Sequence, residues 1–127
     1  MSIFVGPSAY ATSSEPLRFV GKVFSCLPGV SDHDVTPTTS VRLKGGTYWV
    51  TPPAVGDRIS LTILDPEGAV AAVYCDRLPV PPFQALAEIN SPTAGLVPLG
   101  FTVRITYERE TDEACELGIS LMWFVGD

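Results

Sequence analysis

Glycine and proline are spread along the whole chain, and their placement limits the possible folds more than any other feature of the sequence. The 127 residues include 11 glycines and 12 prolines, which fall between short apolar segments and do not gather in one block. Both residue types interrupt regular structure and favour turns. Such frequent interruption is typical of a β protein with many turns. Strands do not alternate with helical stretches of about 10–15 residues, which excludes a βαβ architecture.

Length and composition indicate one packed domain. Hydrophobic residues make up 46% of the chain and charged residues 17%, so a disordered chain is excluded. The net charge of −6 argues against binding to a nucleic-acid backbone or an anionic membrane. No stretch approaches the roughly 18 consecutive apolar residues of a membrane-spanning helix. We therefore expect no nucleic-acid or membrane partner.

The N-terminal sequence lacks the basic start and the apolar run of a secretory signal, so we expect synthesis in the cytosol. The three cysteines, Cys26, Cys75 and Cys115, are too few and too scattered for a disulfide framework. We expect them to be reduced and buried as small hydrophobic residues. The sequence also allows the alternative that two of them form a disulfide bridge.

Residues 1–16 are predicted to form an extended N-terminal arm, and residues 17–127 a single domain. A Ser-, Ala- and Pro-rich arm has little reason to order by itself. The hypothesis is that it lies on a neighbouring subunit. Its apolar residues Ile3, Phe4, Val5 and Tyr10 are then the anchors; the alternative is that they cover their own domain.

About seven strands are predicted, at residues 17–24, 41–50 (interrupted at Gly45-Gly46), 57–64, 69–75, 101–108 and 116–125. The segment 57–64 shows the clearest alternation of apolar and polar residues, which is typical of a strand with one face in the core. Asp65-Pro66-Glu67-Gly68 predicts a tight turn before the strand that follows.

The remaining segments are less regular. Residues 25–38 are predicted to be a long loop. Residues 83–89 are either a short helix or an irregular strand, and the segment with Pro92, Gly95 and Pro98 is predicted to be a loop. Gly45-Gly46 allows either a hairpin or a β-bulge.

These patterns together predict an all-β, antiparallel β-sandwich, most simply a jelly roll. A small closed barrel is the alternative.

The chain offers few candidates for chemistry. Asp32-His33-Asp34 holds the only histidine and could supply metal ligands, but no second histidine or Cys-x-x-Cys motif accompanies it. The alternative, which we favour, is a solvated loop. Nucleophilic catalysis would also depend on His33 as the base, and no Gly-x-Ser-x-Gly turn is present.

Residues 108–116 contain five acids and one base. They lie between two predicted strands, where we expect water to solvate them and their charge to block edge pairing. Glycosidase chemistry is less favoured because it needs two carboxylates that face each other across a cleft, and calcium binding is less favoured because the EF-hand spacing is missing. We expect no cofactor, no metal and no catalytic residue.

Tyr48 and Trp49 are adjacent in a predicted strand and so point to opposite faces. One is expected in the core, and the other at a subunit contact or stacked on a sugar. Trp49 is our candidate for the contact.

The order of several segments resembles small β-sandwich accessory proteins of tailed-bacteriophage virions, which decorate heads or form the bases of fibres. The segments are Leu43-Lys44-Gly45-Gly46-Thr47-Tyr48-Trp49-Val50, Val55-Gly56-Asp57, Leu64-Asp65-Pro66-Glu67-Gly68 and Gly100-Phe101-Thr102-Val103-Arg104-Ile105-Thr106-Tyr107. The similarity covers about residues 41–125 and leaves residues 76–99 and the N-terminal arm unmatched.

The resemblance implies a non-enzymatic virion protein that stabilises a particle as a capsid decoration, a cement protein or a fibre-base component. The implied partners are further copies of the chain, as a trimer or larger homo-oligomer, and a major capsid or other virion protein. The alternative is a carbohydrate- or ligand-binding module, such as a tail receptor-binding component, with Trp49 or Trp123 as the stacking platform.

Overall fold

The computed structural model describes residues 17–80, 87–90 and 95–125, and within these ranges the protein is built from nine antiparallel strands. The arm at residues 1–16, with Ile3, Phe4, Val5 and Tyr10, lies outside the described residues. The strands are β1 (Leu17–Cys26), β2 (Gly29–Val35), β3 (Val41–Thr51), β4 (Arg58–Leu64), β5 (Val70–Pro79), β6 (Ala87–Ile89), β7 (Gly95–Val97), β8 (Thr102–Arg109) and β9 (Cys115–Val125).

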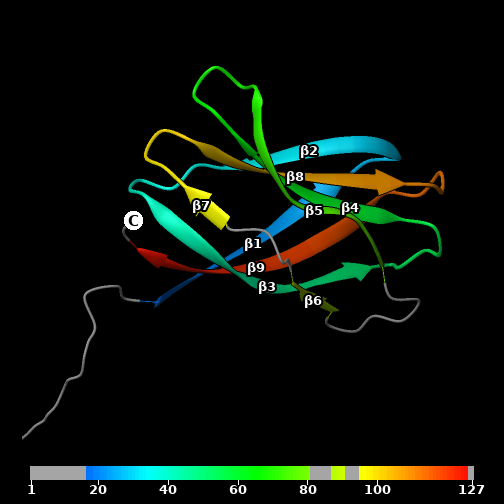
Figure 1. Ribbon diagram of the computed structural model, residues 1–127. Coiled ribbons are helices and arrows are strands. Elements are labelled where there is room, and N and C mark those ends of the chain that lie inside the picture. The colour runs from blue at the N-terminus through cyan, green and yellow to red at the C-terminus, as the bar shows by residue number, and fades with distance from the viewer. Residues whose placement is uncertain (1–16, 81–86, 91–94, 126–127) are drawn as a thin grey trace, which may run out of the picture.

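The strands form two sheets that pack face to face (Figure 1). One sheet has the order β1-β9-β3-β6, with β7 also pairing with β3, and the other has the order β2-β8-β4-β5. The expected all-β, antiparallel sandwich is thereby confirmed, and the alternative of one closed barrel is wrong because the two sheets stay separate.

The strand pairs are nested around a single turn. β4 pairs with β5, β3 with β6 and β7, β2 with β8, and β1 with β9, so that paired strands lie nearly equally far from residues 65–69 on either side. The chain is thus one long antiparallel hairpin, folded across itself to make two layers. Pairing of β3 with β9 and of β4 with β8 then joins these strand pairs into the two sheets.

The turn at the tip of this hairpin has the predicted chemistry. The Asp65 carboxylate accepts hydrogen bonds from the backbone N–H groups of Glu67 and Ala69, both at 2.9 Å. Gly68 N–H donates to the Asp65 carbonyl at 2.9 Å, and Gly68 has a φ of 89°. A residue without a side chain is favoured at this φ, which explains the glycine.

The double glycine in β3 is a bulge and not a hairpin. The pairing of β3 with β9 shifts register between Leu43 and Gly46, while the strand continues on both sides. A side chain at Gly46 would collide with the backbone carbonyl of Ser120. Because glycine has no side chain, Gly46 lets the backbones of β3 and β9 approach more closely than any other residue would permit at this bulge.

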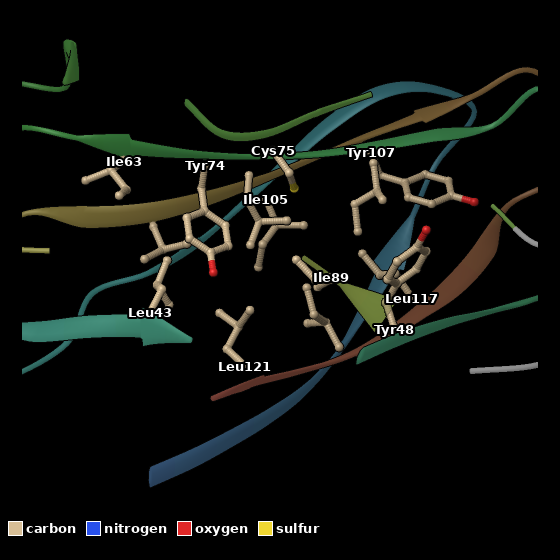
Figure 2. Close-up of a cluster of buried hydrophobic side chains, with 14 of the residues drawn as sticks. Leu43, Tyr48, Ile63, Tyr74, Cys75, Ile89, Ile105, Tyr107, Leu117 and Leu121 are labelled. Carbon is tan, nitrogen blue, oxygen red and sulfur yellow. The ribbon is translucent and has the colours of Figure 1, made fainter. Parts of the chain in front are cut away.

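The core fills the space between the two sheets (Figure 2). The alternating residues Val103, Ile105 and Tyr107 of β8 are fully buried, as the pattern predicts. Leu117 and Leu121 of β9 are also buried and point into the same interior (Figure 2). The remaining buried members come from β1, β3, β4, β5, β6, β7 and β9, and Val80 follows β5 directly.

Tyr48 and Trp49 point to opposite faces, as expected. Tyr48 is in the core, where its hydroxyl donates to the carbonyl of Pro79 at 2.6 Å and so links β3 of one sheet to β5 of the other. Trp49 lies on the outer face of the five-stranded sheet.

Two loop predictions were wrong. The segment 25–38 contains β2, whose polar residues are tolerated because β2 is an edge strand with one solvated face. The segment around Gly95 contains β7, where a glycine fits because Leu43 and Tyr74 press against it. Of residues 83–89, the described part is the short strand β6 at Ala87–Ile89; residues 83–86 lie outside the described residues.

Candidate functional site

The outer face of the four-stranded sheet carries charged pairs, beside the exposed Val30 and Val73. Arg104 on β8 donates two hydrogen bonds to Asp34 on β2, at 2.9 and 3.1 Å. Arg77 on β5 makes a similar two-point contact with Glu108 on β8, at 3.1 Å for each bond. Water solvates such pairs readily, so this face is suited to contact with solvent.

The outer face of the five-stranded sheet has a different character. A row of directly paired residues crosses three strands, from Val23 on β1 through Gly118 on β9 to Trp49 on β3. The next row runs from Gly21 through Ser120 to Thr47. We call this surface the Trp49 face, defined by Gly21, Val23, Thr47, Trp49, Gly118 and Ser120.

Trp49 lies flat across its neighbour. A side chain at Gly118 would overlap the indole atoms Cε2, Nε1 and Cζ2, so the ring occupies the space above this glycine. Gly118 is buried although it lies on the outer side of the sheet, and the indole lies over it. The small residue and the aromatic residue therefore form one packed unit on an exposed face.

Two shallow hollows adjoin on this surface. The first, of about 240 Å³, is lined by Trp49, Val23 and the two glycines Gly21 and Gly118, among others. The second, of about 320 Å³, lies toward β6 and has Lys44, Glu88 and Asn90 at its rim. Both hollows include Thr47 and Ser120, so together they extend across the sheet.

Further apolar groups continue the same face. Met122 lines the second hollow, and Phe124 lies half-buried beside it in β9. The ammonium of Lys44 sits 5.6 Å from the centre of the Phe124 ring, within the range of a cation–π contact. A charged group therefore also lies on this face, held against an aromatic ring.

Trp123 does not belong to this surface. Its side chain is 6% exposed and points into the core, so of the two tryptophans only Trp49 can serve as an outer platform.

The metal candidate Asp32-His33-Asp34 does not converge on one point. Because these residues lie in β2, Asp32 and Asp34 point outward and His33 points inward. Asp32 accepts from the Thr106 hydroxyl at 2.8 Å, and Asp34 is bound by Arg104. Among the described residues, no group of three or more His, Cys, Asp and Glu side chains is placed to hold a metal ion.

His33 instead packs against β1. Its ring stacks on Phe24, with centroids 4.6 Å apart, and its Nε2 lies 3.4 Å from Cys26 Sγ and 3.3 Å from Ser31 Oγ. Burial raises the pKa of the Cys26 thiol to about 11, so the sulfur is protonated at neutral pH. The structure therefore holds His33 in a thiol–imidazole contact, with the thiol fully buried.

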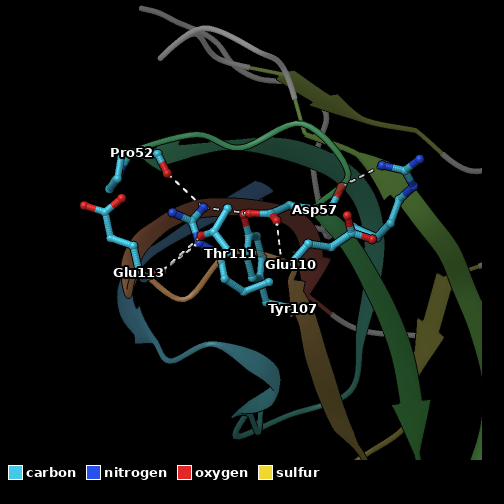
Figure 3. A network of polar contacts seen from close by, with 8 residues as sticks. Pro52, Asp57, Tyr107, Glu110, Thr111 and Glu113 are labelled. Carbon is cyan, nitrogen blue, oxygen red and sulfur yellow. Dashed lines mark hydrogen bonds and ion pairs between the residues drawn. The ribbon is translucent and has the colours of Figure 1, made fainter.

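The sequence reasoning missed a buried polar network at one end of the sandwich (Figure 3). The carboxylate of Asp57 accepts from Arg109 Nη1 at 2.7 Å, from the Tyr107 hydroxyl at 2.7 Å and from the backbone N–H of Glu110 at 3.0 Å. The alternation predicted for β8 contained the signal, because two residues beyond Tyr107 the pattern places Arg109 inward.

This network connects two loops, the β3–β4 loop with Pro52 and Asp57 and the β8–β9 loop with Glu110 and Glu113. Arg109 also donates to the carbonyl of Pro52 and to that of Glu113, both at 2.9 Å. Burial, followed by the hydrogen bond to Asp57, raises the pKa of Tyr107, which keeps its hydroxyl a donor. The polar atoms that meet here are engaged with each other, and their effect is to hold the end of the sandwich closed.

The remaining acids of residues 108–116 are solvated, as predicted. Glu110, Asp112, Glu113 and Glu116 are exposed, and Glu108 pairs with Arg77 on the outer face.

Comparisons with known proteins add no assignment: no family model and no curated protein matches this chain. Within the part of the chain that the structure describes, no helix has the length and hydropathy needed to cross a bilayer.

Proposed function

We propose that this chain is a non-enzymatic structural protein of a virion, a capsid decoration or fibre-base component that stabilises a phage particle through oligomeric protein–protein contacts. The observation that carries the proposal is the difference between the two outer faces. One bears paired charges, and the other bears an aromatic residue, small residues and two hollows. A protein that works by contact needs one such face, and a desolvated aromatic residue is the usual centre of an interface.

The topology supports the same reading. Nested pairing of the first strand with the last, the second with the second last and so on is the connectivity of a jelly roll, a fold used by viral capsid proteins and by lectins. We propose that the sandwich is a jelly roll on this ground. Fold alone does not define function, so the argument depends on the Trp49 face.

The N-terminal arm extends the proposed contact. It precedes Leu17, which begins β1 at the edge of the five-stranded sheet. Sixteen residues can span roughly 50 Å when extended, enough to reach a neighbouring copy. Ile3, Phe4, Val5 and Tyr10 would then be anchors on that copy, beside Trp49. Repeated copies would add avidity, and binding only to the assembled shell would stabilise it by mass action.

The experiment compares two matched valines. Val23 is 62% exposed on β1 at the Trp49 face, and Val30 is 70% exposed on β2 at the charged face. Val23→Lys should lower the native mass toward that of a monomer and weaken particle binding, whereas Val30→Lys should leave both unchanged. Native mass spectrometry and co-sedimentation with particles measure the two effects. A wild-type chain that is monomeric and does not bind particles contradicts the proposal.

Deletion of residues 1–10 tests the arm separately. The truncated chain should bind particles more weakly at an unchanged melting temperature. Full binding without these residues would remove the arm from the proposal and leave the Trp49 face.

A second candidate function is a carbohydrate-binding module. It is favoured by one observation, the flat indole of Trp49 beside an open hollow, because sugars stack on such rings. Titration of glycans followed by tryptophan fluorescence distinguishes the two. A saturable change that disappears in Trp49→Ala, and not in a chain with Val30→Lys, would favour sugar binding.

A further inference from the structure

Cys26 and Cys115 are direct neighbours across the sheet. Cys26 is the last residue of β1 and Cys115 the first residue of β9, and the two are Cα partners in the antiparallel ladder. Directly opposed residues in such a ladder have Cα atoms about 4.5 or 5.5 Å apart, and both values lie within the usual range of about 4.4–6.8 Å for a disulfide. Both side chains point inward and are buried, so they lie on the same side of the sheet.

The two thiols already interact. Each lies near enough to the other to affect its pKa, and both cysteines are free. The third cysteine, Cys75, is in β5 of the opposite sheet, where its partner is Leu61. Among the three, only the pair Cys26 and Cys115 therefore has the placement that a bridge requires.

From this placement we propose that Cys26 and Cys115 are a redox modification site, which forms an intramolecular disulfide when the protein meets a disulfide oxidant of the glutathione type. The inference does not depend on the proposed function. It selects one pair out of the three pairings that the sequence leaves open.

The reaction is a thiol–disulfide exchange in two steps. One cysteine loses its proton, and its sulfur attacks glutathione disulfide, which forms a mixed disulfide and releases one glutathione thiolate. The second cysteine then loses its proton, attacks the mixed disulfide and releases the second thiolate. The two released thiolates take up the two protons, so that two protein thiols and one glutathione disulfide become one protein disulfide and two glutathione thiols.

Neighbouring groups allow this chemistry and keep it slow. His33 Nε2, 3.4 Å from Cys26 Sγ, is placed to accept the first proton. The raised pKa of Cys26 leaves little thiolate at neutral pH, which slows the attack. Both cysteines are at the end of the ladder, next to the exposed Leu27 and Ala114, so local opening exposes them without separating the sheet. The pair should therefore stay reduced in a reducing compartment and bridge in an oxidising one.

The bridge would act on the edge strand. β1 pairs only with β9 in the described part of the structure, and it leads directly to the N-terminal arm. A covalent link at its far end restrains the chain between residues 26 and 115 in the unfolded state, which stabilises the folded form.

The test uses the full-length reduced protein in a buffer with excess oxidised glutathione. Free thiols are then blocked with N-ethylmaleimide, and peptides are mapped by mass spectrometry without reduction. We expect a Cys26–Cys115 link, equal in yield in Cys75→Ser, missing in Cys26→Ser and in Cys115→Ser. The melting temperature of the oxidised wild type should exceed that of the reduced protein by roughly 5–15 °C, with no such rise in Cys115→Ser.

A parallel sample, refolded from urea in the same buffer, gives the oxidant full access to the thiols. A bridge that includes Cys75, or no Cys26–Cys115 link in either sample, overturns the proposal. A link that forms in either sample but lowers the melting temperature also overturns it, because the native register would then not accommodate the bond.

Discussion

Arg109 and Asp57 form an ion pair that is closed off from water. Arg109 Nη1 and Asp57 Oδ2 are 2.7 Å apart, and their side chains are 1% and 0% exposed. By comparison, the side chains of Arg104 and Asp34, an Arg–Asp pair on the outer face, are 36% and 43% exposed. The same chemical contact therefore occurs twice in this protein in opposite environments, which makes the two pairs natural controls for each other.

Removal of one partner from the buried pair should destabilise the protein strongly. Asp57→Ala leaves the Arg109 charge buried without its counter-ion, at a cost of about 3–5 kcal/mol. Asp34→Ala should cost less than about 1 kcal/mol, because water replaces the lost contact. Urea unfolding followed by circular dichroism measures both values. Equal costs for the two variants would contradict the role assigned to burial.

Addition of a methyl group at Gly118 should disturb Trp49. Because the indole occupies this space, Gly118→Ala must displace the ring, at a cost of about 1–3 kcal/mol and with a red shift of the fluorescence as the ring becomes more exposed. In a Trp49→Ala background the same change should cost much less. Additive effects of the two substitutions would mean that the residues do not pack on each other.

The two glycines Gly46 and Gly21 should respond differently to alanine. A Cβ at Gly46 meets the backbone carbonyl of Ser120, which cannot move without breaking the β3–β9 pairing, so Gly46→Ala should cost about 3 kcal/mol. A Cβ at Gly21 meets nothing within 4 Å, and Gly21→Ala should be within about 0.5 kcal/mol of the wild type. Thermal unfolding of the two variants checks the order, and a reversed order would refute the bulge geometry.

Acid should weaken the protein partly through Asp34. The hydrogen bonds from Arg104 lower the pKa of this carboxyl group below its ordinary value of 3.8. As the pH falls, the unfolded chain takes up the proton first, so this contribution is complete above the unfolded pKa and is lost as the pH falls through the folded pKa. Between about pH 5 and pH 2, Asp34→Asn should lose less stability than the wild type. Urea midpoints over this range measure the difference; parallel curves for the two proteins would exclude the effect.

Local patterns were sufficient for the strands that bury one face. Residues 57–64 and 101–108 alternate cleanly because their inner side chains meet the core and their outer side chains meet water, and the structure has β4 and β8 there. The turn at Asp65 was predictable for a similar reason, since the residues that stabilise it are all within five positions. Strand β2 could not be predicted from its composition, which includes Asp32 and Asp34 on its outer side. It is a strand because it pairs with β8.

The sequence by itself determined the β class of the protein, its central turn and the inward residues of its best strands, because these depend on neighbours a few positions apart. Only the tertiary structure decided that Arg109 meets Asp57, that Cys26 faces Cys115 and that Trp49 covers Gly118. Each of these contacts depends on the register between strands that are distant along the chain. Register follows from the whole folded hairpin, in which every pair must fit at once, and no local stretch of residues carries that information.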